Sequence, residues 1–309
     1  KFEAAWQDLL TCHRLARLVA RGGTGIEALV GIAIDGMTND ANLAYLERAK
    51  LTSKQILDCL KDLQALPPMA SMADKIDLFE RFSYLQTMQL IRRGSSGMFE
   101  DPVTGKPRKP TPDELKALEM IDWESALKEG NTWYNRMVVA LRLKDRVERE
   151  KEFDKIEKEL EVLQKESKQD GSLAKLMKVK NDPGKTVGKK ISTVMIGLLT
   201  PAMRKLQAAH DRSVQFERNR HLAFALAAYE RDNSRYPAKL ADLSPKYLAI
   251  VLDDLFSGKA LIYQPSEKGY LLYSVGVNGK DEGGRWVDDE PPGDDPRVRM
   301  PLPPLKEKK

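Results

Sequence analysis

Apolar residues recur at helical spacing through most of the chain before Tyr236, and short alternating runs replace them afterwards. A spacing of three to four residues puts apolar side chains on one face of a helix, whereas alternation puts them on one face of a strand. The sequence therefore predicts a multi-helix region followed by a smaller region that contains strands.

Capping signals mark where the predicted helices begin and end. A helix over residues 1–21 ends at Gly22 and Gly23. In a capping box, a Thr and a Glu or Gln three residues later bond each other's backbone N–H groups. Three pairs have this spacing: Thr24 with Glu27, Thr52 with Gln55 and Thr111 with Glu114. Ser71 with Asp74 can cap a further helix. Pro and Gly crowd residues 94–112, which predicts a loop.

A long helix is predicted from Trp133 to about Gln169. Four of its apolar residues, Phe153, Ile156, Leu160 and Leu163, are spaced 3, 4 and 3 apart, as in a short coiled-coil seam. Charged residues of both signs surround them. Two interpretations remain open. The segment is either a solvated helix packed by one narrow stripe or a coiled coil that binds a partner.

The charge balance argues against nucleic acid as a partner. The 309 residues include 51 Lys and Arg and 46 Asp and Glu, for a net charge of +5. Both signs mix along the chain, whereas nucleic-acid binding gathers cations on one face. No apolar run reaches the about 18 residues of a membrane span. Because the chain begins with Lys1, we expect export or membrane attachment to depend on a segment that precedes it.

Cysteines and histidines give no catalytic or metal-binding motif. Cys12 and Cys59 can form a disulfide if the chain is exported, or can be two buried small residues. The three histidines, His13, His210 and His221, have no second ligand at metal spacing. We therefore expect no enzyme activity, although buried carboxylates or histidines clustered in the helical region would favour an enzyme.

The clearest boundary lies at residues 181–190, where Asn, Asp, Pro and Gly gather between charged residues. We predict a helical domain over 1–180, a linker over 181–190, a second domain over 191–290 and a disordered tail over 291–309. In the second domain a helix from about Ile191 to Arg231 precedes two strands, over 260–264 and 270–274, that are joined by a turn at 267–269.

Three stretches of the second domain resemble a known family. The run Ala225 to Asn233 leads into Tyr236-Pro237, and the turn Asp254-Leu255-Phe256-Ser257-Gly258 follows. Then comes Tyr270 to Gly284, with the sequence YLLYSVGVNGKDEGG. In type and order these elements resemble the soluble domain of the major pseudopilins of type II secretion. About 190 residues precede the helix that the resemblance covers.

The resemblance implies an α+β fold, with a long helix packed on a small antiparallel sheet, and a calcium-binding loop after the second strand. Carried over by position, the Ca²⁺ ligands are the carbonyls of Val275 and Lys280, the side chain of Asn278 and the carboxylates of Asp288 and Asp289, with Asp281 as a further candidate. Glycines between these residues let carbonyls turn towards a cation, which prefers six to eight oxygen ligands. An ordinary Gly-rich turn with solvated acids remains the alternative.

These expectations favour a non-enzymatic, extracytoplasmic structural or assembly protein with a pseudopilin-like module. Its partner would be another protein or further copies of itself. The alternative is a binding module that recognises a peptide or a surface polymer in a groove between helices. A cluster of exposed aromatic residues that includes Trp123, Trp133 and Tyr134 would favour this alternative.

Overall fold

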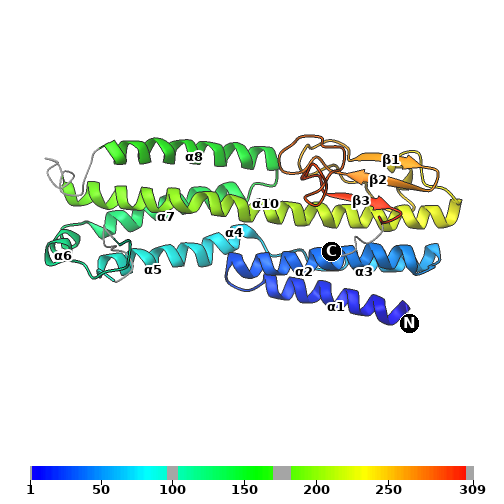
Figure 1. The fold of residues 1–309 in the computed structure, drawn as a ribbon, viewed down its shortest axis with the longest axis horizontal. Helices are drawn as coiled ribbons and strands as arrows, with labels where there is room; N and C mark the ends of the chain where they lie inside the picture. Colours follow the sequence, from blue (N-terminus) through cyan, green and yellow to red (C-terminus); the bar gives the residue numbers. More distant parts are fainter. Residues whose placement is uncertain (1, 96–103, 170–181, 304–309) are drawn as a thin grey trace. The chain divides into compact units, whose positions relative to one another are not determined.

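The structure, a computed structural model, describes residues 2–95, 104–169 and 182–303. Over these ranges the fold is α+β, as predicted (Figure 1). The helical elements are α1 (Phe2–Ala20), α2 (Gly25–Arg48), α3 (Ser53–Gln64), α4 (Met72–Lys75), the π-helix η1 (Ile76–Glu80), α5 (Arg81–Arg92), α6 (Pro112–Glu119), α7 (Trp123–Leu141), α8 (Arg146–Gln169), α10 (Pro183–Asn233) and the 3₁₀ helix η2 (Leu240–Leu243). The strands are β1 (Ile262–Ser266), β2 (Gly269–Tyr273) and β3 (Arg297–Met300). No helix in the described ranges is both long enough and apolar enough to cross a membrane.

The chain divides into two compact units, and each is described by itself. Unit 1 comprises residues 1–22, 26–70 and 208–309, and unit 2 comprises residues 23–25 and 71–207. Helix α10 therefore contributes its first part to unit 2 and its second part to unit 1. This division differs from the predicted one, because the first three helices share a core with the sheet. Periodicity along the chain does not show which distant segments pack together.

Unit 1 places the second part of α10 between a sheet and a set of helices. Figure 1 shows the sheet on one side of this helix and α2 with α3 on the other. One core joins them: Trp6 and Leu10 of α1, Leu60 of α3, Phe224 of α10 and Leu272 of β2 are all buried within it. Burial of a Leu or Phe side chain contributes about 1.5–3 kcal/mol, so this shared core holds the sheet and the helices of unit 1 together.

The sheet is antiparallel, in the order β1-β2-β3. The hairpin of β1 and β2 pairs Ser266 with Gly269, and its strands lie within about two residues of the predicted ones. Strand β3 pairs Tyr270 with Met300 and falls inside the segment that was predicted to be a disordered tail. Val298 and Met300 alternate with two arginines and are buried, so this run satisfies the strand pattern despite the prolines around it.

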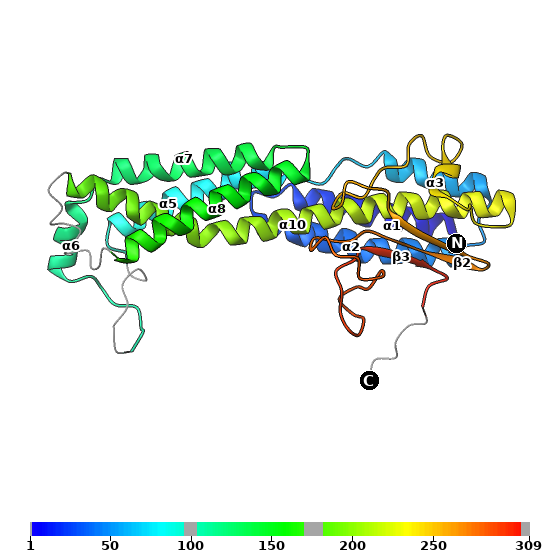
Figure 2. The same ribbon diagram turned by 90° about the horizontal axis from the view of Figure 1, so that it is seen from above.

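Unit 2 is helical in its described ranges. Helices α5, α7, α8 and the first part of α10 surround a core that contains Tyr84, Tyr134, Met137 and Ile196 (Figure 2). The predicted single helix from Trp133 to Gln169 is wrong, because α7 ends at Leu141 and α8 begins at Arg146. The chain reverses there so that α8 packs back on α7.

The stripe of α8 that resembles a coiled-coil seam is covered within the chain. Phe153, Ile156 and Leu160 are 1–2% exposed and belong to the core of unit 2. This burial supports the interpretation of a solvated helix packed by one narrow stripe. The stripe is therefore not a free surface for a partner.

Two of the predicted capping boxes are confirmed. Thr52 with Gln55 and Thr111 with Glu114 each show both reciprocal bonds, and Pro112 follows Thr111 at the start of its helix. Ser71 stands at the start of α4 but makes no capping bond through its side chain. Its place as the N-cap residue is therefore confirmed, whereas the expected side-chain bond is absent.

The predicted linker forms the start of α10 from Pro183 onward, whereas residue 181 lies outside the described ranges. The backbone N–H of Lys185 donates to Asp182 Oδ1 at 3.2 Å, which caps the helix. A Cβ on Gly184 would lie 2.5 Å from the carbonyl oxygen of Met120. The glycine thus marks a close approach between two backbones, where the sequence predicted a linker between domains.

The two cysteines do not form a disulfide. Cys59 is buried in the core of unit 1 and Cys12 is exposed on α1. The interpretation of Cys59 as a small buried residue is the one that the structure supports. Burial raises the pKa of its thiol to about 12, so it stays protonated at neutral pH.

Candidate metal centre

The loop between β2 and β3, residues 274–296, contains seven acidic residues, and neighbouring elements hold both of its ends. Ser274 Oγ donates to Asp254 Oδ1 at 2.5 Å, which ties the start of the loop to the Asp254 turn. At the other end, the carbonyl oxygen of Pro296 accepts from Asn219 Nδ2 at 2.9 Å. Asn219 lies on α10 and is fully buried. The loop therefore starts and ends at fixed positions over the helix.

Three carboxylates converge inside this loop. One oxygen each of Glu282, Asp294 and Asp295 lies within 4.8 Å of the others. Backbone N–H groups position them: Glu282 and Gly284 donate to Asp295 Oδ2 at 3.0 and 2.9 Å, and Asn278 donates to Asp294 Oδ2 at 3.1 Å. The backbone of Asp294 in turn donates to Glu282 Oε2 at 2.6 Å. The chain thus holds three acids together at one point.

Two carboxylate oxygens in this cluster are buried without a hydrogen-bond partner, Asp294 Oδ1 and Asp295 Oδ1. Asp295 is 0% exposed. Burial, together with the charges of Glu282 and Asp281, raises its pKa above the ordinary value for an aspartic acid, although two backbone hydrogen bonds oppose the shift. Buried carboxylates are normally paired or coordinate a cation. The donor set fits a hard divalent cation such as Ca²⁺, which binds carboxylate and carbonyl oxygens.

Two glycines permit this geometry. Gly284 has a φ of 72°, a region that favours glycine, and its N–H reaches Asp295. Gly276 has a φ of 64°, and a Cβ there would overlap the backbone of Asp294. Any larger residue at Gly276 would separate the two ends of the acid cluster.

The acids that the resemblance proposed as closing ligands lie elsewhere. Asp288 and Asp289 both pair with Arg297 of β3, and Asp289 Oδ2 also accepts from the backbone N–H of Trp286 at 2.8 Å. Asp294 and Asp295, and not Asp288 and Asp289, lie beside Glu282 in the acid cluster.

The other proposed ligands surround the cluster without joining it. Asn278 Oδ1 accepts from the N–H of Lys280 at 2.7 Å, so this side chain closes its own turn. Asp281 Oδ1 accepts from Tyr273 Oη at 3.0 Å and lies close enough to influence the pKa of Asp295. Val275 and Lys280 occupy the same loop, within the first turns after β2.

Sequence reasoning missed Asp294 and Asp295 because they fall in the segment predicted to be disordered. A signal was present, since Gly293-Asp294-Asp295-Pro296 directly precedes the alternating run of β3. Had that run been identified as a strand, the two acids would have stood at the end of a loop closed by the sheet.

A second group of buried polar residues lies between α1, α2 and α10. His13 Nδ1 donates to Asp35 Oδ1 at 2.6 Å, and His13 Nε2 accepts from Asn42 Nδ2 at 2.5 Å. Arg17 Nη1 also donates to Asp35 Oδ1, at 2.7 Å, and Arg220 Nη1 donates to Asp35 Oδ2 at 3.3 Å. Burial alone would raise the pKa of Asp35, but the bond from His13 and the two arginines lower it overall. The carboxylate is therefore ionised and fully engaged.

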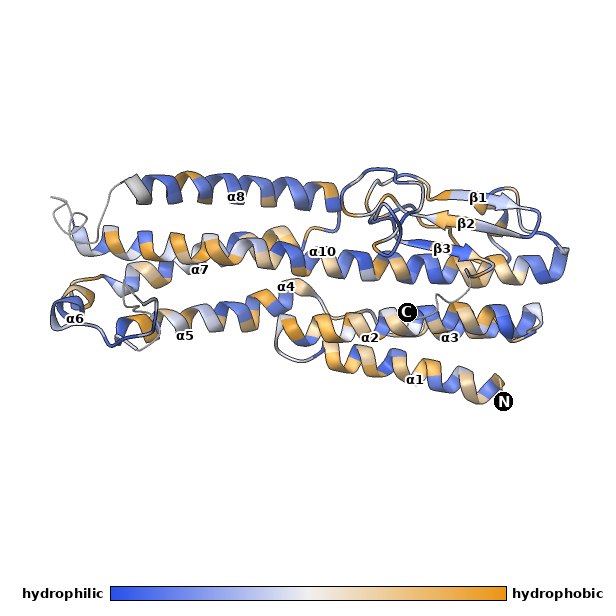
Figure 3. Cartoon of the chain, in the orientation of Figure 1, coloured by the Kyte–Doolittle hydropathy of each residue, from blue (hydrophilic) through white to orange (hydrophobic). Residues whose placement is uncertain are grey.

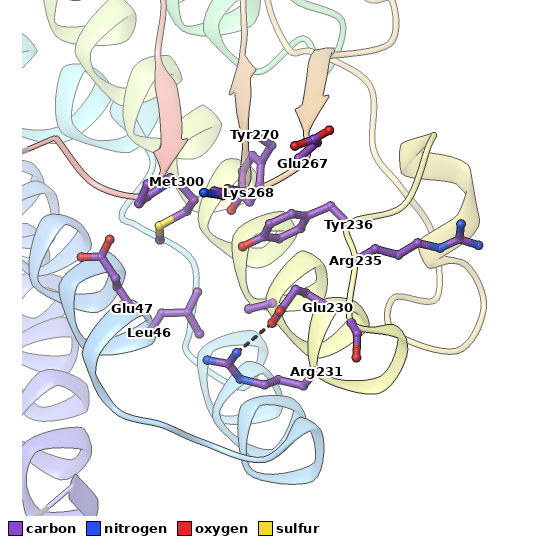
Figure 4. Close-up of a pocket in the computed structure, with 13 residues that line it drawn as sticks. Leu46, Glu47, Glu230, Arg231, Arg235, Tyr236, Glu267, Lys268, Tyr270 and Met300 are labelled. Atoms are coloured by element: carbon purple, nitrogen blue, oxygen red, sulfur yellow. Dashed lines mark hydrogen bonds and ion pairs between the residues drawn. The ribbon is translucent and has the colours of Figure 1, made fainter.

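A shallow cleft of about 190 Å³ lies where the end of α10 meets α2 and the β1–β2 turn. Figure 4 shows Leu46 and Glu47 on one side and Tyr236 with Arg231 on the other. Its lining contains three cations and three carboxylates; these are Arg231, Arg235, Lys268, Glu47, Glu230 and Glu267. Because these charges balance, the cleft shows no preference for an anion or a cation.

Comparison with protein-family models, with curated proteins and with solved structures found no match to this chain.

Proposed function

We propose that this chain is a structural or assembly protein without enzymatic activity that works outside the cytoplasm, and that Ca²⁺ stiffens its pseudopilin-like C-terminal module. The observation that carries the proposal is the buried Asp295, whose Oδ1 has no hydrogen-bond partner beside two further carboxylates. The long helix packed on a small antiparallel sheet supports the pseudopilin-like part of the proposal.

A bound cation would explain why three acids meet in this loop. Like charges close together disfavour ionisation, and burial adds to the penalty. A divalent ion offsets both effects and ties Glu282, on the β2 side of the loop, to Asp294 and Asp295, which directly precede β3. The consequence is mechanical, because β3 could not separate from the loop without releasing the ion.

The buried histidine cluster does not supply a catalytic site in this proposal. His13 uses both ring nitrogens, and Asp35 uses both oxygens, for contacts within the chain. His13 is 0% exposed and Asp35 is 3% exposed, so a substrate has no route to either side chain. A general base must reach the proton that it removes. These residues are better understood as a packed polar layer between helices.

The aromatic residues that would favour a binding module are buried. Trp123, Trp133 and Tyr134 are 7, 4 and 0% exposed and lie in the core of unit 2. They form no exposed aromatic surface for a peptide or a polymer. The binding-module alternative draws no support from them.

Thermal unfolding with Ca²⁺ and with a chelator tests the proposal. A ligand at one hundred times its dissociation constant stabilises the folded state by about 2.7 kcal/mol, so we expect Ca²⁺ to raise the melting temperature by several degrees. Asp295→Asn keeps an acceptor oxygen for the two backbone N–H groups but removes the charge, and should abolish the shift.

Asp289→Asn is the matched control. It weakens the ion pair with Arg297, so it should lower stability equally with and without Ca²⁺ and leave the calcium shift intact. A shift that disappears in Asp289→Asn and persists in Asp295→Asn would contradict the site described above.

The location is tested by fractionating cells that express the full-length gene. Protection of the protein from added protease in intact cells would oppose a location at the cell surface. Recovery with the cytoplasmic fraction, under conditions that release periplasmic proteins separately, would refute the extracytoplasmic proposal.

A further inference from the structure

Helix α2 has an exposed face that lacks charge over its first half. One side of the helix is buried, through Ala28, Gly31, Asp35 and Asn39. The opposite side is exposed at six positions, none of them charged: Ile26, Leu29, Val30, Ala33, Gly36 and Met37. Ile26 and Met37 are 73 and 67% exposed. The first half of α2 is largely orange in Figure 3, which marks apolar residues.

The spacing of this face is that of a helix-packing seam. Ile26, Val30, Ala33 and Met37 are separated by 4, 3 and 4 residues, the a/d pattern by which two helices pack together. On the other side of the helix, Gly31 meets α1, where a Cβ would lie 2.5 Å from the carbonyl oxygen of Ala16. At Gly36 a Cβ would meet no atom within 4 Å. The inner side is thus closed and the outer side is open.

We propose that this face, defined by the six residues above and called the α2 face, pairs with the α2 face of a second copy of the chain in an antiparallel, two-fold arrangement. The small residues Ala33, near its centre, and Gly36, about one turn further on, leave room for a partner helix, and the larger Ile26 and Met37 lie at its two ends. A two-fold axis at Ala33 sets Val30 of one copy against Gly36 of the other. The face is therefore complementary to itself.

The charges at the two ends of the face support a second copy as the partner. Asp40 follows the face on the same side of α2, and Arg21 precedes the face, in the turn after α1. Both residues are exposed. Neither has an ion pair with another described residue of this chain. Seven residues separate Asp40 from Ala33, and seven separate Ala33 from Ile26. In the antiparallel pair Asp40 therefore lies opposite Ile26 of the partner, beside the partner's turn with its arginine.

The neighbourhood of Asp40 within its own chain is unfavourable to its charge. Desolvation and the nearby Asp288 raise the pKa of Asp40 above its ordinary value. A cation from a second copy would compensate it, and the two-fold axis provides this contact twice. A membrane surface is a poorer match, because the charge that borders the face on α2 is Asp40, which anionic lipid repels, and the next exposed charges of α2, Glu47 and Arg48, balance each other.

The pair should be weak. The face from Ile26 to Met37 spans about 17 Å of helix at a rise of about 1.5 Å per residue. A contact along one helix of this length buries less than the roughly 800 Å² per partner of a standard interface. We therefore expect dissociation constants in the micromolar range. The proposed dimer does not depend on the proposed calcium site. The experiment is done in chelator, so that its result is the same whether or not the chain binds calcium.

Sedimentation velocity over a micromolar concentration series tests the pairing. The parent chain should change from monomer to dimer across the series. Met37→Glu puts a charge at an exposed position of the face and should weaken dimerisation by at least about tenfold. Ile250→Glu is the control, since Ile250 is 72% exposed elsewhere in the same unit and should have no effect.

A charge exchange then distinguishes self-pairing from other occupants. Asp40→Arg and Arg21→Asp should each weaken the dimer, and the double variant should restore it, because each new charge meets its opposite across the two-fold axis. A parent chain that stays monomeric, a dimer insensitive to Met37→Glu, or a double variant no better than the single ones would overturn the proposal. Cosedimentation of the parent with vesicles that contain anionic lipid, lost in Met37→Glu, would also overturn it and assign the face to a membrane.

Discussion

His221 shows what burial does to a titratable side chain in this fold. It lies on α10 beside the polar cluster, and its Nε2 is buried without a hydrogen-bond partner. Burial, with the positive charges of Arg220 and Arg17, lowers its pKa to about 4, although Asp35 opposes the shift. The pKa of His13 is also lowered, mainly by burial. Both imidazoles are therefore neutral in the folded protein at pH values where an unfolded histidine is charged.

The sign of the consequence follows from proton binding. Below pH 6.5 the unfolded chain takes up protons that the folded chain refuses down to about pH 4, so stability falls as the pH falls through this window. We expect His221→Leu to reduce the slope of unfolding free energy against pH by up to about 1.4 kcal/mol per pH unit. Urea unfolding at a series of pH values measures this slope, and an unchanged slope would show that His221 is not responsible.

Gly130 offers a second test at the level of one residue. A Cβ there would overlap the phenol ring of Tyr84, which is 2% exposed and whose Oη lies 2.8 Å from Ser192 Oγ. Replacement of a glycine in a helix by Ala ordinarily gains about 1 kcal/mol. We expect Gly130→Ala to lower stability instead, by about 1–3 kcal/mol. A stabilised variant in denaturant unfolding would mean that Tyr84 moves aside freely.

At the level of elements, sequence patterns located most helices but not their partners. Capping boxes at Thr52 and Thr111 placed two helix starts correctly, because the bonds involved are local. The reversal between α7 and α8 was missed, since charged helix-forming residues continue through it and only packing of Phe153 on the core requires it. Strand β3 was missed because its pairing partner, β2, lies more than twenty residues earlier.

The candidate metal site shows the same limit. The loop and its glycines could be located from the sequence, but the choice between Asp288 with Asp289 and Asp294 with Asp295 could not. In the structure Arg297 pairs with Asp288 and Asp289, which leaves Asp294 and Asp295 beside Glu282. This contact exists only once β3 has formed, and so only a structure that includes β3 reveals it.

The two caps provide a matched prediction at this level. Thr52 accepts from the backbone N–H of Gln55, whereas Ser71 makes no capping bond. We expect Thr52→Ala to cost about 1 kcal/mol and Ser71→Ala to cost much less, as measured by denaturant unfolding. Equal losses would show that the capping bond at Thr52 contributes little.

At the level of the whole molecule, α10 is the element that both units share. It contributes Ile196 and Met203 to the core of unit 2, and Leu222 and Phe224 to that of unit 1. The chain thus builds two cores on one continuous helix of 51 residues. In unit 1 the helix also supports the acidic loop through Asn219, so the proposed ion would stiffen the part of the molecule that rests on α10.

Titration calorimetry of the chain with Ca²⁺ tests the central claim most directly. We predict binding of one ion per chain, lost in Asp295→Asn, retained in Asp289→Asn, and weakened as the pH falls through the raised pKa of Asp295, because protons then compete for the carboxylate. Absence of binding in the parent, or binding that survives Asp295→Asn unchanged, would contradict the claim that this loop is a calcium site.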